Sequence, residues 1–324
     1  MEPSFFIASN LNNGLVWDST DVGSAETSPD DTVVPAVLNN QLFIGGTVTM
    51  EAFENIGGTD FPFLRSGLYI DKGVSAPFSM VKASNSFLWV GKGENEDAAI
   101  WMLRGNEPVR VSTDAIDSLL DTLTDTELSD VWAWSYGQRG VYFAGFNLPN
   151  TTLVYDLKSE LWHERKSRVT LPGGAVVDTR WRVNSIEKVY GTFLVGDSQD
   201  GTIGELDPDV FTEYGNRVFR SIATQPFQNN MAGFVVPSLE LTIESGVGNA
   251  TEPDPKVSMS RSLDGKTFTP PRERSAGKIG EYGKRQIWTR VGRARRFEVF
   301  KFEFSGKNKF VVVQLTADIR PTRK

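Results

Sequence analysis

The first candidate for acid–base chemistry is His163, the only histidine in the chain. It lies in the sequence Trp162-His163-Glu164-Arg165, where Glu164 or the nearby Asp156 could orient it as a general base. No nucleophile motif of the G-x-S-x-G type accompanies it. A strand-end histidine that holds a sheet corner through hydrogen bonds is the competing interpretation. Because the 324 residues include no cysteine, thiol catalysis and Cys-ligated metal sites are excluded, and no cofactor is predicted.

Residues 262–268, SLDGKTF, are the second candidate. Asp264-Gly265 favours a tight turn, because both residue types tolerate a positive φ. The segment is similar to the Asp-box hairpin of sialidase-like β-propellers, although it is one residue shorter and occurs once. That box is structural even in enzymes, and a glycosidase would need two carboxylates at a defined separation. A glycan-binding or glycan-cleaving β-propeller therefore remains an alternative, with no pair of acids singled out.

The third candidate is a group of cations in an otherwise acidic chain. The net charge of −7 combines −18 over the first 260 residues with +11 from Arg261 onward. Such asymmetry is typical of an interaction surface of each sign. The basic part could contact nucleic-acid phosphate, or it could contact the acidic part of a neighbouring copy. The candidate contact residues are Lys284, Arg285, Arg290, Arg293, Arg295 and Arg296.

These cations lie in a segment predicted to form antiparallel sheet. Residues 286–291 and 297–304 alternate with period two, which places Phe300, Phe302 and Phe304 on one buried face. Trp288 is predicted to lie in the core of the same sheet. Residues 257–260 and 267–269 are predicted as strands on either side of the turn at Asp264. We treat residues 235–324 as a basic, hairpin-rich subregion of one domain that spans residues 1–324.

The rest of the chain is predicted to be almost entirely β-structure. Short strands and turn signals recur every 8–12 residues, a spacing typical of a sandwich, barrel or propeller. One short helix is predicted over residues 112–123, capped by Ser112 or Thr113 and with apolar residues along one face. Aromatic–glycine segments at residues 87–91, 141–145 and 192–196 recur roughly every 50 residues, the length of one four-stranded propeller blade. The predicted fold is all-β and β-propeller-like.

No apolar run approaches the ~18 residues of a membrane span. The N-terminus also lacks a charged segment followed by a long apolar one. We therefore expect no membrane insertion.

Several blocks of sequence resemble one known family. They include F-x-x-S-x-L-x-x-G-x-x-W (residues 6–17), SAETSPDD (24–31), FPFLR (61–65), VSTDAID (111–117) and VYDLKSELWHER (154–165). Near the C-terminus the shortened S-x-D-G-x-T-F hairpin is followed by GKIGEYGKR, an I-W-x-R strand and the arginine cluster. In this order the blocks resemble the packaged-DNA stabilisation proteins, the tail-hub or head-completion proteins of short-tailed bacteriophages. The similarity covers nearly the whole chain.

The resemblance implies a structural virion protein and not an enzyme. It implies a β-propeller subunit that assembles, typically as a hexamer, around the tail channel below the portal, helps retain packaged DNA and carries fibres, spikes or a needle. Partners would be other copies, portal and adaptor proteins, and DNA passing through the channel. The protein would reside in the phage tail after assembly in the host bacterial cytoplasm. Family members usually have a further N-terminal portion, so the number of blades in this chain stays open.

Overall fold

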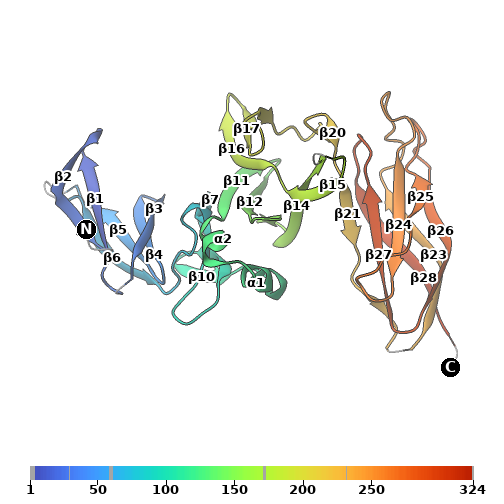
Figure 1. Ribbon diagram of the computed structural model, residues 1–324, viewed down its shortest axis with the longest axis horizontal. Helices are drawn as coiled ribbons and strands as arrows, with labels where there is room; N and C mark the ends of the chain where they lie inside the picture. The colour runs from blue at the N-terminus through green and yellow to red at the C-terminus, as the bar shows by residue number, and fades with distance from the viewer. Residues whose placement is uncertain (1–3, 29, 58–60, 171–172, 231, 323–324) are drawn as a thin grey trace. The chain divides into compact units, whose positions relative to one another are not determined.

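Antiparallel strands make up most of the computed structural model, which describes residues 4–28, 30–57, 61–170, 173–230 and 232–322. The chain divides into two compact units, Met1–Leu206 and Asp207–Lys324, named the N-terminal and C-terminal units below (Figure 1). The expected single domain of residues 1–324 therefore differs from the structure. Among the described residues, the strands after residue 217 pair with one another and enclose a core of their own, which makes the C-terminal unit a separate body.

The N-terminal unit is a series of antiparallel sheets, each built from consecutive strands. The first large sheet contains β3 (Thr32–Leu38), β4 (Gln41–Gly46), β5 (Met50–Asn55) and β6 (Phe63–Ile70). The second contains β7 (Val81–Ala83), β8 (Ser86–Gly91), β9 (Ala99–Arg104) and β10 (Glu107–Arg110). The third contains β11 (Trp132–Gln138), β12 (Val141–Asn147), β13 (Thr152–Asp156), β14 (Leu161–Thr170) and β15 (Val176–Arg180). The first two sheets have the four antiparallel strands that the sequence predicted for a blade, whereas the third has a fifth strand, β15.

Two smaller sheets flank these three along the chain. A two-stranded sheet of β1 (Phe5–Asn10) and β2 (Asn13–Ser24) precedes them. A three-stranded sheet of β16 (Val183–Val189), β17 (Thr192–Asp197) and β18 (Ile203–Glu205) follows them. The predicted aromatic–glycine segments are β8, β12 and β17, the second strands of three successive sheets, so the repeat is confirmed. Strand β4, with Phe43-Ile44-Gly45, occupies the same place in its sheet at a different spacing.

Neighbouring sheets share apolar clusters. Phe43 and Trp89 join the first large sheet to the second, Leu88 and Phe146 join the second to the third, and Trp134 and Val195 join the third to β16–β18. Phe6 of β1 packs on Phe53 of β5 with ring centroids 5.0 Å apart. Within the described residues no buried cluster joins β16–β18 to β1–β2 or to β3–β6.

The described residues form two α-helices, one within residues 112–123, where the sequence predicted a helix, and one just after them. Helix α1 (Asp114–Leu120) buries Ile116 and Leu120, in agreement with the predicted apolar face, but it ends three residues early. Helix α2 (Asp125–Ser129) follows it and buries no residue. Thr124 accepts a hydrogen bond from the backbone N–H of Glu127, whose side chain accepts one from the backbone N–H of Thr124. This capping box stabilises a helix that lacks the apolar periodicity on which the prediction depended. A short 3₁₀ helix, η1 (Pro77–Ser79), precedes β7.

The C-terminal unit packs two antiparallel sheets against each other (Figure 1). One contains β21 (Arg220–Ala223), β22 (Phe227–Gln228), β24 (Lys256–Ser262), β25 (Arg272–Ser275) and β27 (Phe297–Phe304). The other contains β23 (Phe234–Ile243), β26 (Gln286–Ala294) and β28 (Val312–Pro321), and β19 (Thr212–Glu213) pairs separately with β20 (Asn216–Arg217). Phe300, Phe302 and Phe304 face Trp288 in one core, as predicted. The indole N–H of Trp288 donates to the carbonyl of Arg272 at 2.7 Å.

The expected strand over residues 267–269 does not form. Strand β24 ends at Ser262, and the chain next becomes extended at Arg272, beyond the two prolines. The carboxylate of Asp264 accepts from the backbone N–H groups of Lys266 and Thr267 at 2.8 and 2.7 Å. These bonds satisfy the donors that a ladder would have used, so the segment closes as a turn.

Candidate functional site at the arginine end of the C-terminal unit

The six cations predicted as contact residues are all exposed, but the structure does not bring them into one cluster. They follow the length of β26, whose nine residues span roughly 30 Å. Lys284 and Arg285 precede the strand, Arg290 and Arg293 lie on it, and Arg295 and Arg296 form the turn to β27.

Arg285 is committed to an internal ion pair. Its Nη2 and Nε lie 2.6 and 2.8 Å from the carboxylate oxygens of Glu240 on β23. The bond from Arg285 lowers the pKa of Glu240, and the same bond raises the pKa of Arg285. Arg285 is therefore a weaker candidate for contacts with a partner than the sequence indicated.

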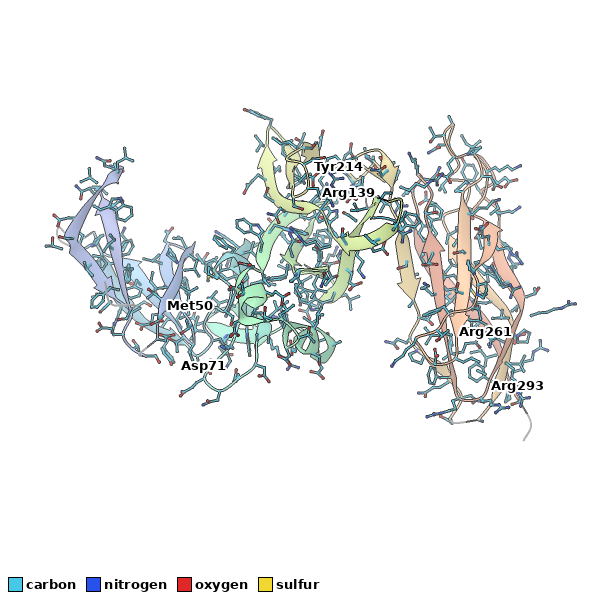
Figure 2. All side chains as sticks on the ribbon, in the orientation of Figure 1. Met50, Asp71, Arg139, Tyr214, Arg261 and Arg293 are labelled. Carbon is cyan, nitrogen blue, oxygen red and sulfur yellow. The ribbon has the colours of Figure 1, made fainter. Side chains whose placement is uncertain are left out.

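The opposite end of β26 concentrates arginines. Val235 of β23 pairs with Arg293 on one side and with Arg320 of β28 on the other, so these two arginines lie roughly 10 Å apart across three strands. We name Arg293, Arg295, Arg296 and Arg320 the arginine end; Figure 2 labels Arg293. Arg320 was not among the predicted contact residues, because only the pairing of β28 with β23 places it near Arg293.

The cations of the arginine end are largely uncompensated. Within the described residues, the side chains of Arg290, Arg293, Arg295 and Arg296 make no hydrogen bond or ion pair, whereas Arg320 contacts Asp318 at 2.8 Å. Arg290 has a left-handed backbone (φ 52°), where a bulge interrupts the pairing of β26 with β23. This surface can bind anionic groups without breaking an existing ion pair, except at Arg320.

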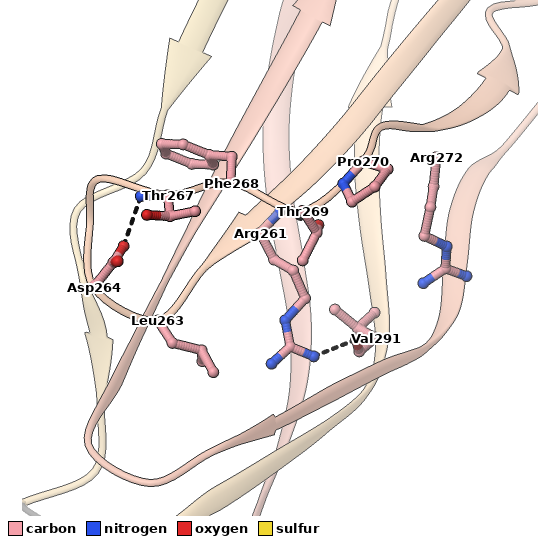
Figure 3. A pocket seen from close by; sticks show the side chains of 9 residues that line it. All are labelled: Arg261, Leu263, Asp264, Thr267, Phe268, Thr269, Pro270, Arg272 and Val291. Atoms are coloured by element: carbon pink, nitrogen blue, oxygen red, sulfur yellow. Dashed lines mark hydrogen bonds between the residues drawn. The ribbon is translucent and has the colours of Figure 1, made fainter.

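A second set of arginines, Arg261, Arg272 and Arg274, serves the fold. Strand β26 lies at the edge of its sheet, and an edge strand leaves carbonyls without a ladder partner. Arg274 donates to the carbonyl of Ile287 at 2.9 Å and Arg272 to that of Thr289 at 2.8 Å. Arg261 donates to the carbonyl of Val291 at 2.6 Å (Figure 3) and to that of Arg293 at 3.0 Å. This arginine ladder joins the edge of one sheet to the other sheet.

Arg261 also neutralises a buried carboxylate. Its Nε lies 2.5 Å from Oε1 of Glu298, which is fully buried. Burial raises the pKa of Glu298, and the Arg261 cation opposes that rise. Gly292 leaves room for the guanidinium, because a Cβ at this position would lie 1.1 Å from Nη1 of Arg261. The pair is structural, since the two opposite charges neutralise each other.

A groove of about 600 Å³ lies beside the ladder and beneath the Asp264 turn (Figure 3). Its lining includes Leu263, Phe268 and Pro270 together with Arg261 and Arg272. Asp264 is its single carboxylate, and hydrogen bonds from the backbone hold the pKa of that carboxyl well below its usual range. The groove therefore lacks the pair of acids that glycoside hydrolysis requires.

His163 lies on β14 beside Arg165, whose Nε donates to its Nε2 at 3.4 Å. Burial of the ring and the Arg165 cation lower the pKa of His163 to about 4. The proposed orienting residue Glu164 instead accepts from Thr151 at 3.2 Å. Arg165 lies over the ring of Trp181 at 4.8 Å and donates to the hydroxyl of Tyr136 at 2.7 Å. The exposed His163 thus lies beside an aromatic–arginine cluster, within β14 and not at a strand end as the structural interpretation expected.

The part of the chain that the structure describes shows neither a metal-binding cluster nor a membrane-spanning helix. No group of three or more His, Asp or Glu side chains in it is arranged to hold a metal ion. None of its helices is long and apolar enough to cross a membrane.

Both units are similar to known proteins. A sequence model of a family described as "Bacteriophage P22 Gp10, beta-propeller" matches residues 2–211, and one described as "Bacteriophage P22 Gp10, beta-sandwich" matches residues 220–320. The tail hub protein gp10 of Salmonella phage P22 is 21% identical over 292 residues, which cover 88% of this chain. The chain spans 59% of the length of that relative.

Solved structures give only weak similarity. An exo-β-1,3-galactanase from Phanerochaete chrysosporium is 9% identical with a TM-score of 0.27, covering 87% of this chain and 79% of its own. A putative TolB from Agrobacterium tumefaciens is 10% identical with a TM-score of 0.25, covering 89% and 95%. At such scores neither supports a conclusion about function.

The two units and their matches define a class: bacteriophage proteins with a β-propeller unit followed by a β-sandwich unit. Within that class, the chain belongs to the family of the P22 tail hub protein Gp10. The predicted family and all-β fold are thereby confirmed, with the C-terminal part identified as a sandwich. The family is not one of enzymes, and the glycan-binding or glycan-cleaving alternative is not favoured.

Proposed function

We propose that the chain is one subunit of a hexameric ring that forms the hub of a short phage tail. The ring would close the channel below the portal and so help retain packaged DNA. The observation that supports this proposal is that the two parts of the Gp10 family, the β-propeller and the β-sandwich, match successive segments of the same chain. The remaining partners would be portal and adaptor proteins above the ring, and tail fibre, spike or needle proteins. Assembly would take place in the host bacterial cytoplasm.

We assign the arginine end to protein contacts within this assembly. The N-terminal unit carries 28 acidic and 14 basic side chains, and the C-terminal unit 13 and 20, so the units have net charges of −14 and +7. Oppositely charged surfaces on one chain favour contacts between neighbouring copies or with an acidic adaptor. Contact with DNA phosphate is the second candidate, supported by the same unpaired cations. Strong phosphate binding would, however, oppose the sliding of DNA through a channel.

Light scattering of the full chain at low and high salt tests the ring. We expect a defined oligomer at low salt that dissociates as salt screens the charged contacts. The variant in which Arg293, Arg295 and Arg296 are all replaced by Ala should lose the oligomer, while the control Arg285→Ala should keep it. A chain that stays as single copies at low salt up to its solubility limit would contradict the ring.

Binding to a fluorescent DNA duplex separates the two candidate roles of the arginine end. If these arginines contact phosphate, the wild-type affinity should fall steeply with salt, and the triple variant should have a shallower dependence. Equal, weak DNA binding by both proteins, combined with loss of the oligomer in the variant, is the result expected for protein contacts.

A further inference from the structure

The two edges of the sheet β26–β23–β28 differ. The arginine ladder occupies the carbonyls along the edge of β26. The other edge is β28, a ten-residue strand whose residues, within the described chain, make backbone ladder bonds to β23 alone. Its outer positions are open to solvent, with Val313 68% exposed and Ile319 40% exposed. A long, uncapped, β-branched edge is a template for another strand.

In the described part of the chain, strand β2 also has an edge without a partner strand. It pairs with β1 in a sheet of only two strands, and residues 13–20 are exposed on both faces. Leu15 and Trp17 are 92% and 55% exposed. An isolated two-stranded sheet is marginally stable in water, and a further strand would cover its apolar residues.

Charge distinguishes these two edges. The first 64 residues of the chain include nine acidic residues and no Lys or Arg, and two of the acids, Asp18 and Asp21, lie on β2. Strand β28 ends in the arginine end, where Arg320 lies beside Arg293 across Val235. Pairing β2 with β28 would bring the cation-free segment of one chain next to the C-terminal unit of another, which has a net charge of +7, whereas pairing β28 with β28 would bring two positively charged units together.

We propose that β2 of one copy adds to the free edge of β28 in the next copy and extends the sheet β26–β23–β28. The contact joins two different surfaces, so each copy offers one of each, and repetition closes a ring or continues a filament. The inference rests on the proposed ring of copies and names the strands that hold it together. Backbone hydrogen bonds would provide the affinity, and the charges would select the partner edge.

Cysteine cross-linking tests the contact, because the chain has no cysteine of its own. Ser19 of β2 and Thr316 of β28 are both exposed and lie near the middle of their strands. When Ser19→Cys and Thr316→Cys chains are mixed at low salt and oxidised, we expect the mixed disulfide to exceed both homodimers. Thr126→Cys, an exposed site on α2, replaces Ser19→Cys in the control and should give no excess.

A charge placed on the edge provides a second test. Val313→Lys should weaken association at least tenfold, because a lysine there opposes strand addition. Ile203→Lys, the same change at a 72% exposed position on the edge strand β18, should leave association unchanged.

The outcomes separate this inference from the proposed function. An oligomer of defined size without the mixed disulfide, or with only the Thr316→Cys homodimer, would overturn the β2–β28 contact and leave the ring intact. Single copies without any cross-link would overturn both. Unchanged association in Val313→Lys would also overturn the contact.

Discussion

The two units join their sheets by different means. In the N-terminal unit successive sheets share apolar faces, supplemented by neutral hydrogen bonds such as that from the indole N–H of Trp162 on β14 to the carbonyl of Val111 at 2.7 Å. In the C-terminal unit the apolar core is supplemented by charge, since three arginines of one sheet donate to the edge of the other. The arginines of the ladder are therefore used within the fold, so the net charge of this unit exceeds the charge that is available to partners.

The largest expected effect tests whether each unit depends on its own aromatic core. Trp288 and Trp89 are both fully buried, one in each unit. Truncation to Ala should cost about 3–5 kcal/mol in either case, through lost burial and the cavity left behind. We expect Trp288→Ala to speed hydrogen exchange in peptides of the C-terminal unit and Trp89→Ala in those of the N-terminal unit.

Hydrogen exchange of the full chain, resolved by peptide, measures both variants in one experiment. Trp17→Ala is the control, because Trp17 lies on the exposed part of β2. If Trp288→Ala left the exchange of β23, β26 and β27 unchanged, its place in the core of the sandwich would be wrong.

The next effect tests the charged connection in the C-terminal unit. Arg261→Met leaves the carboxylate of Glu298 buried without a counter-charge and removes two bonds to β26. The expected loss is about 3 kcal/mol, as for other broken buried pairs. The double variant Arg261→Met, Glu298→Met should recover part of this loss, because neither charge is then buried.

Urea unfolding of the wild type, both single variants and the double variant gives the coupling energy. Additive losses, with no coupling between residues 261 and 298, would mean that the pair does not stabilise the sandwich. Lys166→Met is a contrasting variant in the N-terminal unit, because its pair with Glu164 is exposed and should contribute little.

The difference between the units also marks how far the sequence could predict the structure. Strands, the blade repeat and the face formed by Phe300, Phe302 and Phe304 follow from local periodicity, which can be read directly from the sequence. The arginine ladder does not follow from local periodicity. It requires β26 to be an edge strand, and β26 is an edge strand because of its pairing with β23, some 50 residues earlier in the chain. Arg272 and Arg274 are two residues apart, which places them on one face of a strand but does not show what that face contacts. The pairing of β28 with β23, which is also non-local, places Arg320 across Val235 from Arg293.

Acidification should act on the two units with opposite signs. The pKa of His163 is lowered from its ordinary 6.5 to about 4, so stability that is complete above pH 6.5 is lost as the pH falls toward 4. The pKa of Glu298 is raised above its ordinary 4.5, so the stability linked to it is complete below pH 4.5 and is lost as the pH rises through the folded value.

Pulse proteolysis in urea from pH 4 to 7.5, with fragments assigned to each unit, measures both trends. His163→Gln should flatten the acid-side loss in the N-terminal unit, and Glu298→Gln should flatten the loss with rising pH in the C-terminal unit. Profiles that the two substitutions leave unchanged would show that neither group is linked to folding.

The smallest effect on stability distinguishes cations that are paired within the fold from cations that we assign to contacts between copies. Arg285 is paired with Glu240 at the surface, whereas Arg296 has no partner within the described residues. Arg285→Ala should therefore lower stability slightly at low salt, and the loss should vanish at high salt as screening removes the pair. Arg296→Ala should leave stability unchanged and should instead weaken association of copies, because an unpaired cation contributes nothing to the isolated fold. Thermal unfolding and light scattering of the two variants at two salt concentrations distinguish these results.

Arg296→Ala could instead lower the melting temperature and leave association intact. The arginine end would then stabilise the fold in the same way as the ladder, and the division between structural and contact arginines would be wrong.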